Sequence, residues 1–223
     1  MKIILVICAA LSLLLVGVSA GASQKPLPNV VLSVSEDAED VVDLFLKNDW
    51  ADAQTLVNNI SKNEADIESE MNRNHMPHSC ADEFNYFVFR LKELARKKQQ
   101  PVMASLAANQ ITALLIDLQD HYTYIVPLEI SRMDYLGREI ILLARMPDNY
   151  GLLDKRISQL RQMWDTFKPD VKRRNGDKIA AQVDHVIGDF QKSASQEQMT
   201  NAGSRILDLV DRLETLFTEH PGG

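Results

Sequence analysis

The chain has 223 residues, with 24 basic side chains, 31 acidic side chains and a formal net charge of −7. This negative charge disfavours binding to nucleic acid or to an anionic membrane surface, because like charges repel. The length is sufficient for a substantial hydrophobic core, and the two cysteines, Cys8 and Cys80, are too few for a disulfide-stapled scaffold.

The first 22 residues have the pattern of a secretory signal peptide. Lys2 gives a positive start, residues 3–16 form an uncharged apolar run, and small residues then offer a cleavage site. The run is shorter than the ~20 residues of a bilayer span, so we expect cleavage rather than a membrane anchor. Cleavage removes Cys8 and the charge of Lys2, which changes the net charge from −7 to −8 and leaves Cys80 without an intrachain partner. The sequence therefore predicts a periplasmic or secreted protein with no membrane span after processing.

After the signal, residues 23–35 contain Pro26 and Pro28 without helical periodicity, so we expect a flexible leader. From residue 36 onward, apolar residues recur every three or four positions and strand alternation is almost absent, which predicts an all-α fold. The first expected helix breaks at Asn48, and the second begins at an Asp49 cap and runs to Pro77.

A third helix is expected to start near Asp82, and a fourth has Pro101 in its first turn, a position that favours proline. Beyond Pro127 the sequence predicts four more helices, over residues 130–145, 150–167, 177–190 and 196–216. The expected architecture thus has about eight helices.

Two parts of the chain align as copies of one helical unit. Trp50 matches Tyr150 at an offset of 100 residues, and Ile111 matches Ile206 at an offset of 95. Unrelated amphipathic helices also match each other in some register, so chance similarity is the alternative to duplication. We expect two similar four-helix sets, residues 36–125 and 126–223, arranged as tandem antiparallel hairpins or as a bundle.

The first hairpin of each set carries an aromatic residue, Trp50 or Tyr150, just after its turn. In this respect it resembles the helical hairpins of tetratricopeptide repeats. The resemblance covers only the hairpins, because the glycine and proline positions of that repeat are missing. It implies hairpin packing and transfers no functional residue to this chain.

The connector between Ile60 and Phe84 contains the five residues that the second copy lacks, and it holds the densest group of soft metal ligands. These ligands are His75, Met76, His78 and Cys80. Imidazole, thioether and thiolate groups suit copper(I) or zinc better than a hard cation. On the expected helix, Glu64, Glu68 and Met71 share a stripe with His75. The alternative is an ordinary polar connector with a buried thiol.

The aromatic run at residues 84–89 is expected to form a helix that is apolar on more than one side. Phe84 and Phe87 share the expected core face, whereas Tyr86 and Phe89 diverge from it. Tyr86 and Phe89 are therefore candidate partner-binding residues, and complete burial in the core is the alternative.

Asp117 and His121 are four residues apart on an expected helix, which fits an oriented base, a metal pair or a surface ion pair. Neither a nucleophile elbow such as G-x-S-x-G nor a glycine-rich phosphate loop occurs. The sequence predicts an exported, non-catalytic helical binding protein that recognises an exported protein or a small ligand. The alternative is a copper or zinc protein that uses the connector, and an enzyme with a site between the two halves is neither supported nor excluded.

Overall fold

The computed structural model describes residues 25–123, 126–146, 149–193 and 195–219, and it confirms the all-α class. The helices are α1 (Asn29–Leu46), α2 (Trp50–Lys62), α3 (Glu64–Arg73), α4 (His78–Lys97), α5 (Pro101–Gln119), α6 (Leu128–Ala144), α7 (Tyr150–Arg173), α8 (Asp177–Lys192) and α9 (Gln196–Glu219). Two short strands, β1 (Lys25–Pro26) and β2 (Tyr122–Thr123), pair in parallel. The expected signal peptide, residues 1–22, lies outside the described residues.

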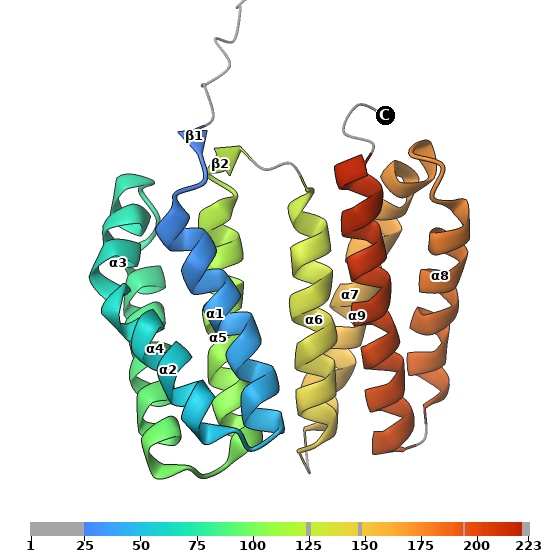
Figure 1. The fold of residues 1–223 in the computed structure, drawn as a ribbon. Coiled ribbons are helices and arrows are strands. Elements are labelled where there is room, and N and C mark those ends of the chain that lie inside the picture. The colour runs from blue at the N-terminus through green and yellow to red at the C-terminus, as the bar shows by residue number, and fades with distance from the viewer. Residues whose placement is uncertain (1–24, 124–125, 147–148, 194, 220–223) are drawn as a thin grey trace, which may run out of the picture.

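The helices group into two lobes, which lie side by side in Figure 1. In the N-terminal lobe, α1–α5, both α1 and α4 pack against α2 and α5. In the C-terminal lobe, α6–α9, α9 packs against α6 and α8 while α7 packs against α6. Each lobe contains its own cluster of buried apolar side chains, and Leu142 of α6 belongs to the cluster of the N-terminal lobe. Helix α6 therefore contributes to both cores.

Two helices begin where capping residues in the sequence predict them. The side chain of Asp49 accepts a hydrogen bond from the backbone N–H of Asp52 at 3.3 Å, so it caps α2. Pro101 lies in the first turn of α5, where its missing N–H leaves no helical hydrogen bond unmade.

The expected leader differs from the structure, because residues 29–35 form the first turns of α1. Val31 and Val34 are fully buried, and the buried Ser35 hydroxyl accepts a hydrogen bond from Gln119 of α5 at 2.9 Å. Burial of this face offsets the weak helical periodicity of the segment. The prediction of a flexible leader is thus wrong for residues 29–35.

The second expected helix is broken at Asn63 into α2 and α3, which gives nine described helices instead of about eight. The Asn63 side chain donates to the carbonyl of Asn59 and competes with the helical hydrogen-bond pattern. The break allows Ile67 and Met71 of α3 to enter the core. Helix α3 is anchored through Glu70, whose carboxylate accepts a 2.6 Å hydrogen bond from Tyr122.

Helices α6 and α9 approach each other closely because each presents a glycine to the other. A Cβ atom at Gly137 would lie 2.9 Å from Leu207 Cδ2, and one at Gly203 would overlap Ile141. The absence of a side chain at these positions therefore sets the separation of the two helices.

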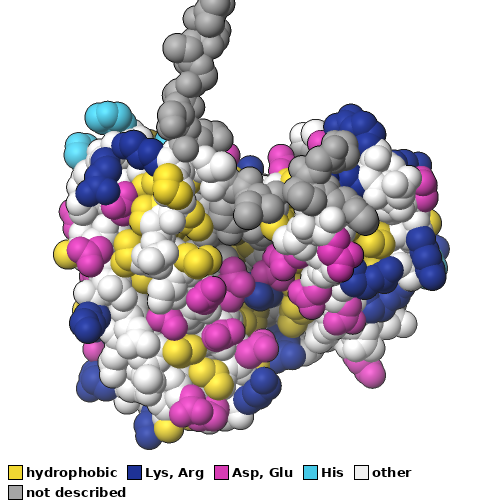
Figure 2. All heavy atoms as spheres, turned by 45° about the horizontal axis from the view of Figure 1, so that its top comes forward, with side chains coloured by type: hydrophobic (Ala, Val, Ile, Leu, Met, Phe, Trp, Pro, Cys, Tyr) yellow, Lys and Arg dark blue, Asp and Glu magenta, His cyan; other side chains and the backbone are white. Residues whose placement is uncertain are grey.

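Polar contacts join the lobes where α1 and α5 meet α6. Arg138 of α6 pairs with Asp134 at 2.6 Å and with Glu39 of α1 at 3.3 Å. The side-chain amide of Asn109 on α5 donates to the carbonyl of Tyr135 at 3.2 Å. Figure 2 shows acidic side chains gathered along the middle of the face of the molecule that it presents.

Asp134 is the most strongly perturbed carboxyl group at this junction. Burial raises its pKa to about 7, and the negative charges of Glu39, Glu214 and Asp211 act in the same direction against the opposing effect of Arg138. The junction therefore contains a carboxyl group that titrates near neutral pH.

Helix α5 is the one described helix that is long and apolar enough to cross a bilayer by length and composition. In its most apolar window, 61% of the residues are buried inside the molecule. The helix packs against α1, α4 and α6, which accounts for this composition as that of a central core helix.

Candidate binding site

The structure separates the four ligands of the expected soft-metal site. His75 and His78 are exposed, whereas Met76 and Cys80 are partly buried against the N-terminal core. Helix α3 ends at Arg73, and His75 follows it with a left-handed backbone φ of 56°, so the expected helical stripe of ligands does not include His75. The connector thus presents its imidazoles and its sulfur atoms to different surroundings.

In the described part of the chain, no group of three or more His, Cys, Asp and Glu side chains is arranged to hold a metal ion. Burial raises the pKa of the Cys80 thiol, and the carboxylates of Glu83 and Asp117 raise it further. The soft-metal hypothesis requires the connector to rearrange around a metal ion that displaces the thiol proton, and it stays a prediction.

The two candidate partner-binding residues are exposed on α4. Tyr86 is 57% exposed and Phe89 is 59% exposed, while Phe84 and Val88 of the same helix are fully buried. The ring of Tyr86 contacts that of Phe87 edge to face, with 5.3 Å between centroids. Helix α4 therefore carries an aromatic surface outside the core, and its role as a partner site stays a prediction.

Asp117 and His121 do not form the expected pair on one helix, because α5 ends at Gln119. His121 is exposed in the segment that leads to β2. Asp117 instead faces the C-terminal lobe and lies 3.6 Å from Arg132.

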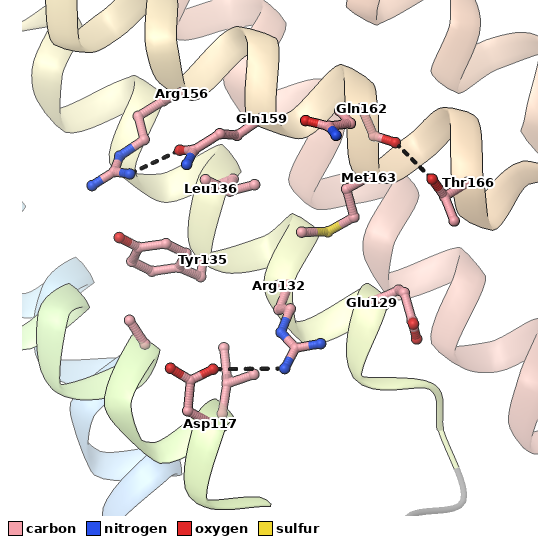
Figure 3. Close-up of a pocket in the computed structure, with 12 residues that line it drawn as sticks. Asp117, Glu129, Arg132, Tyr135, Leu136, Arg156, Gln159, Gln162, Met163 and Thr166 are labelled. Atoms are coloured by element: carbon pink, nitrogen blue, oxygen red, sulfur yellow. Dashed lines mark hydrogen bonds and ion pairs between the residues drawn. The ribbon is translucent and has the colours of Figure 1, made fainter. Parts of the chain in front are cut away.

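The candidate site that the structure adds is an open groove with a volume of about 500 Å³ between α5, α6 and α7. Side chains from α5 and α7 face each other across α6 in Figure 3. The groove is lined by Ala113, Ile116, Asp117, Glu129, Arg132, Tyr135, Leu136, Arg156, Gln159, Gln162, Met163 and Thr166. Its lining combines a small apolar centre with polar and charged side chains.

A network around Glu139 holds one end of the groove. The Glu139 side chain is only 3% exposed, and its two oxygens pair with Arg156 at 2.9 and 3.0 Å. Gln110 of α5 donates to the Glu139 carboxylate at 3.2 Å, and Arg156 donates to Gln159 at 2.8 Å. Burial and the adjacent Glu139 carboxylate raise the pKa of Tyr135, so its hydroxyl stays protonated. These bonds fix α5, α6 and α7 relative to one another.

The other end of the groove holds the guanidinium of Arg132. Its nitrogen lies 3.6 Å from Asp117 and 3.8 Å from Asp120, distances that permit attraction but exceed a good hydrogen bond. Asp117 and Asp120 are mostly exposed, and Glu129 also lines this end. The carboxylates here therefore keep hydrogen-bonding capacity for another molecule.

Sequence reasoning missed this groove, because its residues come from three helices that are separated along the chain. One signal did point to the Glu139 network. Glu139 is followed directly by the apolar residues Ile140, Ile141, Leu142 and Leu143. A carboxylate next to such a run is a candidate for burial, and a buried carboxylate requires a partner.

Comparison with known proteins found no matching family model, no similar curated protein and no similar solved structure.

Proposed function

We propose that the protein is an exported, non-enzymatic binding protein whose partner occupies the groove between α5, α6 and α7. The observation that carries this proposal is the groove itself. It is open, it has an apolar centre, and its Arg132 end carries charged groups that are only loosely paired. A concave site with a few polar groups around an apolar centre is typical of ligand and partner recognition.

The chemistry of the lining supports binding rather than catalysis. The twelve described residues that line the groove include no histidine, cysteine or serine. The charged residues at the Glu139 end are paired with one another, which suits a structural role better than proton transfer.

The test places a photo-crosslinking amino acid at Gln162, which lines the groove and is exposed on α7. Irradiation in the native compartment is expected to yield a specific adduct with one partner molecule. The matched control places the same amino acid at Gln182, which is exposed on α8 outside the groove. Equal adducts at both positions, or none at Gln162, would contradict the proposal.

The aromatic surface of α4 is a second proposed contact for the same partner. Phe89→Asp removes an exposed ring, so the fold is expected to survive. The partner is expected to bind more weakly, which lowers the yield of the crosslinked adduct at Gln162. Circular dichroism checks the fold, and Lys92→Gln on the exposed side of α4, which also lowers the net charge by one, controls for the change in charge. Unchanged recovery of the complex would remove this surface from the proposal.

We also propose that the two lobes are related by internal duplication. The packing of α1 on α2 and α5 corresponds to the packing of α6 on α7 and α9, which supports this relation. The pair α2 and α3 would then correspond to the single helix α7. Under this proposal the groove lies at the junction of two related units, a common position for binding sites.

The soft-metal alternative uses His75, Met76, His78 and Cys80 in a rearranged connector. Elemental analysis of the processed chain, isolated from its native compartment, tests this alternative directly. About one copper or zinc ion per chain, lost in a His78→Ala, Cys80→Ser double variant, would support it. Metal-free protein would remove it.

A further inference from the structure

The groove lies beside α6, between two helices that are not in extensive contact with each other. Helices α5 and α7 each pack against α6, but they make no extensive contact with each other. The residues that α7 contributes include Arg156, Gln159, Met163 and Thr166, which recur every three or four positions along one face. A rod-shaped partner lying parallel to α7 would contact all of them.

The α7 wall of the groove has the length of a short helix. The segment of α7 from Arg156 to Thr166 spans ~15 Å at 1.5 Å per residue, about three turns. The groove, with a volume of about 500 Å³, is open along this wall, so a helix of similar length contacts it with one face only.

The sign of the charge around the groove identifies the kind of helix. Two arginines, Arg132 and Arg156, are surrounded by four carboxylates, those of Asp117, Asp120, Glu129 and Glu139. Arg156 and Glu139 neutralise each other in their short ion pair, so the excess negative charge lies at the Arg132 end. A partner with cations at that end is attracted, and an acidic partner is repelled.

We infer that the groove binds a basic amphipathic helix of about three turns from another protein, a partner class that rests on the proposed binding function. The apolar face of the partner helix packs over the partly exposed side chains of Ala113, Tyr135 and Met163. Its lysine or arginine side chains pair with Asp117, Asp120 and Glu129 at the open end. The partner thereby completes the packing of α5, α6 and α7.

The test uses a fluorescent 14-residue peptide of leucine and lysine in an amphipathic pattern, with a leucine and glutamate peptide of the same pattern as its counterpart. Fluorescence anisotropy with the processed chain is expected to give saturable 1:1 binding of the basic peptide, at least tenfold tighter than that of the acidic one. Binding is expected to weaken with added salt because the ion pairs lie at the exposed end.

Matched variants localise the binding. Ala113→Lys places a cation in the groove wall and is expected to lower the affinity at least tenfold, whereas Ala181→Lys on the exposed face of α8 leaves it unchanged. Ala113→Trp blocks the groove by bulk without altering charge and is expected to act in the same direction. Asp117→Asn with Glu129→Gln is expected to weaken binding several-fold and to reduce its salt dependence.

Equal binding of both peptides, or equal effects of Ala113→Lys and Ala181→Lys, would overturn the inference. If the chain dimerises in analytical ultracentrifugation and Ala113→Trp abolishes the dimer, the occupant is a second copy and the inference is also overturned. The crosslinking test at Gln162 is independent of these outcomes. A specific adduct there without peptide binding would retain the binding function and reject the basic helix.

Discussion

The two lobes differ in how the second part of each, α2 and α3 or α7, packs against its neighbours. In the N-terminal lobe the chain breaks at Asn63, and α3 turns so that its apolar residues join the core. In the C-terminal lobe α7 continues without a break for 24 residues, through Pro169, and makes no extensive contact with α5. The corresponding stretch of chain thus forms two helices that pack into the core of one lobe, and one long helix that lines the groove in the other.

The two lobes also differ in the packing at the turn between their first two helices. At the turn between α1 and α2, Phe45 is fully buried and its ring contacts that of Trp50, with 5.3 Å between centroids. At the turn between α6 and α7, Arg145 lines a cavity of about 600 Å³ whose apolar wall includes Leu153 and Phe190. Among the described residues, an aromatic pair thus fills the space behind the first turn, whereas the second turn borders a cavity.

The largest expected loss in the free energy of unfolding comes from a cavity made in the core of one lobe. Trp164 of α7 is 1% exposed and donates to Asp184 of α8 at 2.8 Å, so Trp164→Ala is expected to lower the free energy of unfolding by about 3–5 kcal/mol. Hydrogen exchange is expected to accelerate first in α7–α9. Phe84→Ala is the matched change in the N-terminal lobe, and equal acceleration in both lobes would show that they unfold as one unit.

The Glu139 network tests what holds the groove open. Glu139→Gln leaves the mostly buried guanidinium of Arg156 without a charged partner, so we expect a loss of about 3 kcal/mol in the free energy of unfolding. Urea denaturation measures the loss. Glu93→Gln breaks an exposed network in the N-terminal lobe and should leave the midpoint nearly unchanged. A comparable loss in both variants would contradict the assigned role of the buried pair.

The junction between the lobes is expected to respond to pH. The pKa of Asp134 is raised from 3.8 to about 7 in the folded chain, so between these values the folded state keeps a proton that the unfolded state has lost. This contribution to stability is therefore complete below pH 3.8 and is lost as the pH rises through 7, a difference of about 2–3 kcal/mol between pH 5 and pH 8.

Urea denaturation of the wild-type chain and of Asp134→Asn at the two pH values checks this prediction. The asparagine does not titrate, so the variant is expected to lose that part of the pH dependence. An identical pH dependence in both proteins would exclude Asp134 as the group responsible.

The smallest expected loss of stability comes from the glycine contact between α6 and α9. Gly203→Ala adds a methyl group that overlaps Ile141 between α6 and α9, and we expect a net loss of about 1–2 kcal/mol despite the better helix propensity of alanine. Gly188→Ala on α8 meets no atom within 4 Å and should be neutral or slightly stabilising. Thermal melts of both variants measure the difference, and a stabilised Gly203→Ala variant would show that the helices separate easily.

Much of the secondary structure was predictable from local chemistry. The period of apolar residues placed α6, α8 and α9 close to their observed bounds, and Asp49 and Pro101 marked helix starts. Helix α7 continues through Pro169 to Arg173, beyond the end expected at residue 167. The break at Asn63 was not predictable, because the helical period continues across it and only the burial of Ile67 decides the new direction. The candidate groove was missed for a related reason, since contacts between distant helices leave no local period.

The sequence by itself determined an all-helical chain and its acidic charge, because these properties depend on composition and on neighbours within a few turns. It left open whether Tyr86 and Phe89 are buried, and the structure exposes both. Only the tertiary structure decided that Arg132 and Asp117 meet, that Glu139 is buried against Arg156, and that His75 and Cys80 have different surroundings. The physical reason is that helix periodicity fixes which face is buried, whereas the packing of whole helices fixes which faces meet.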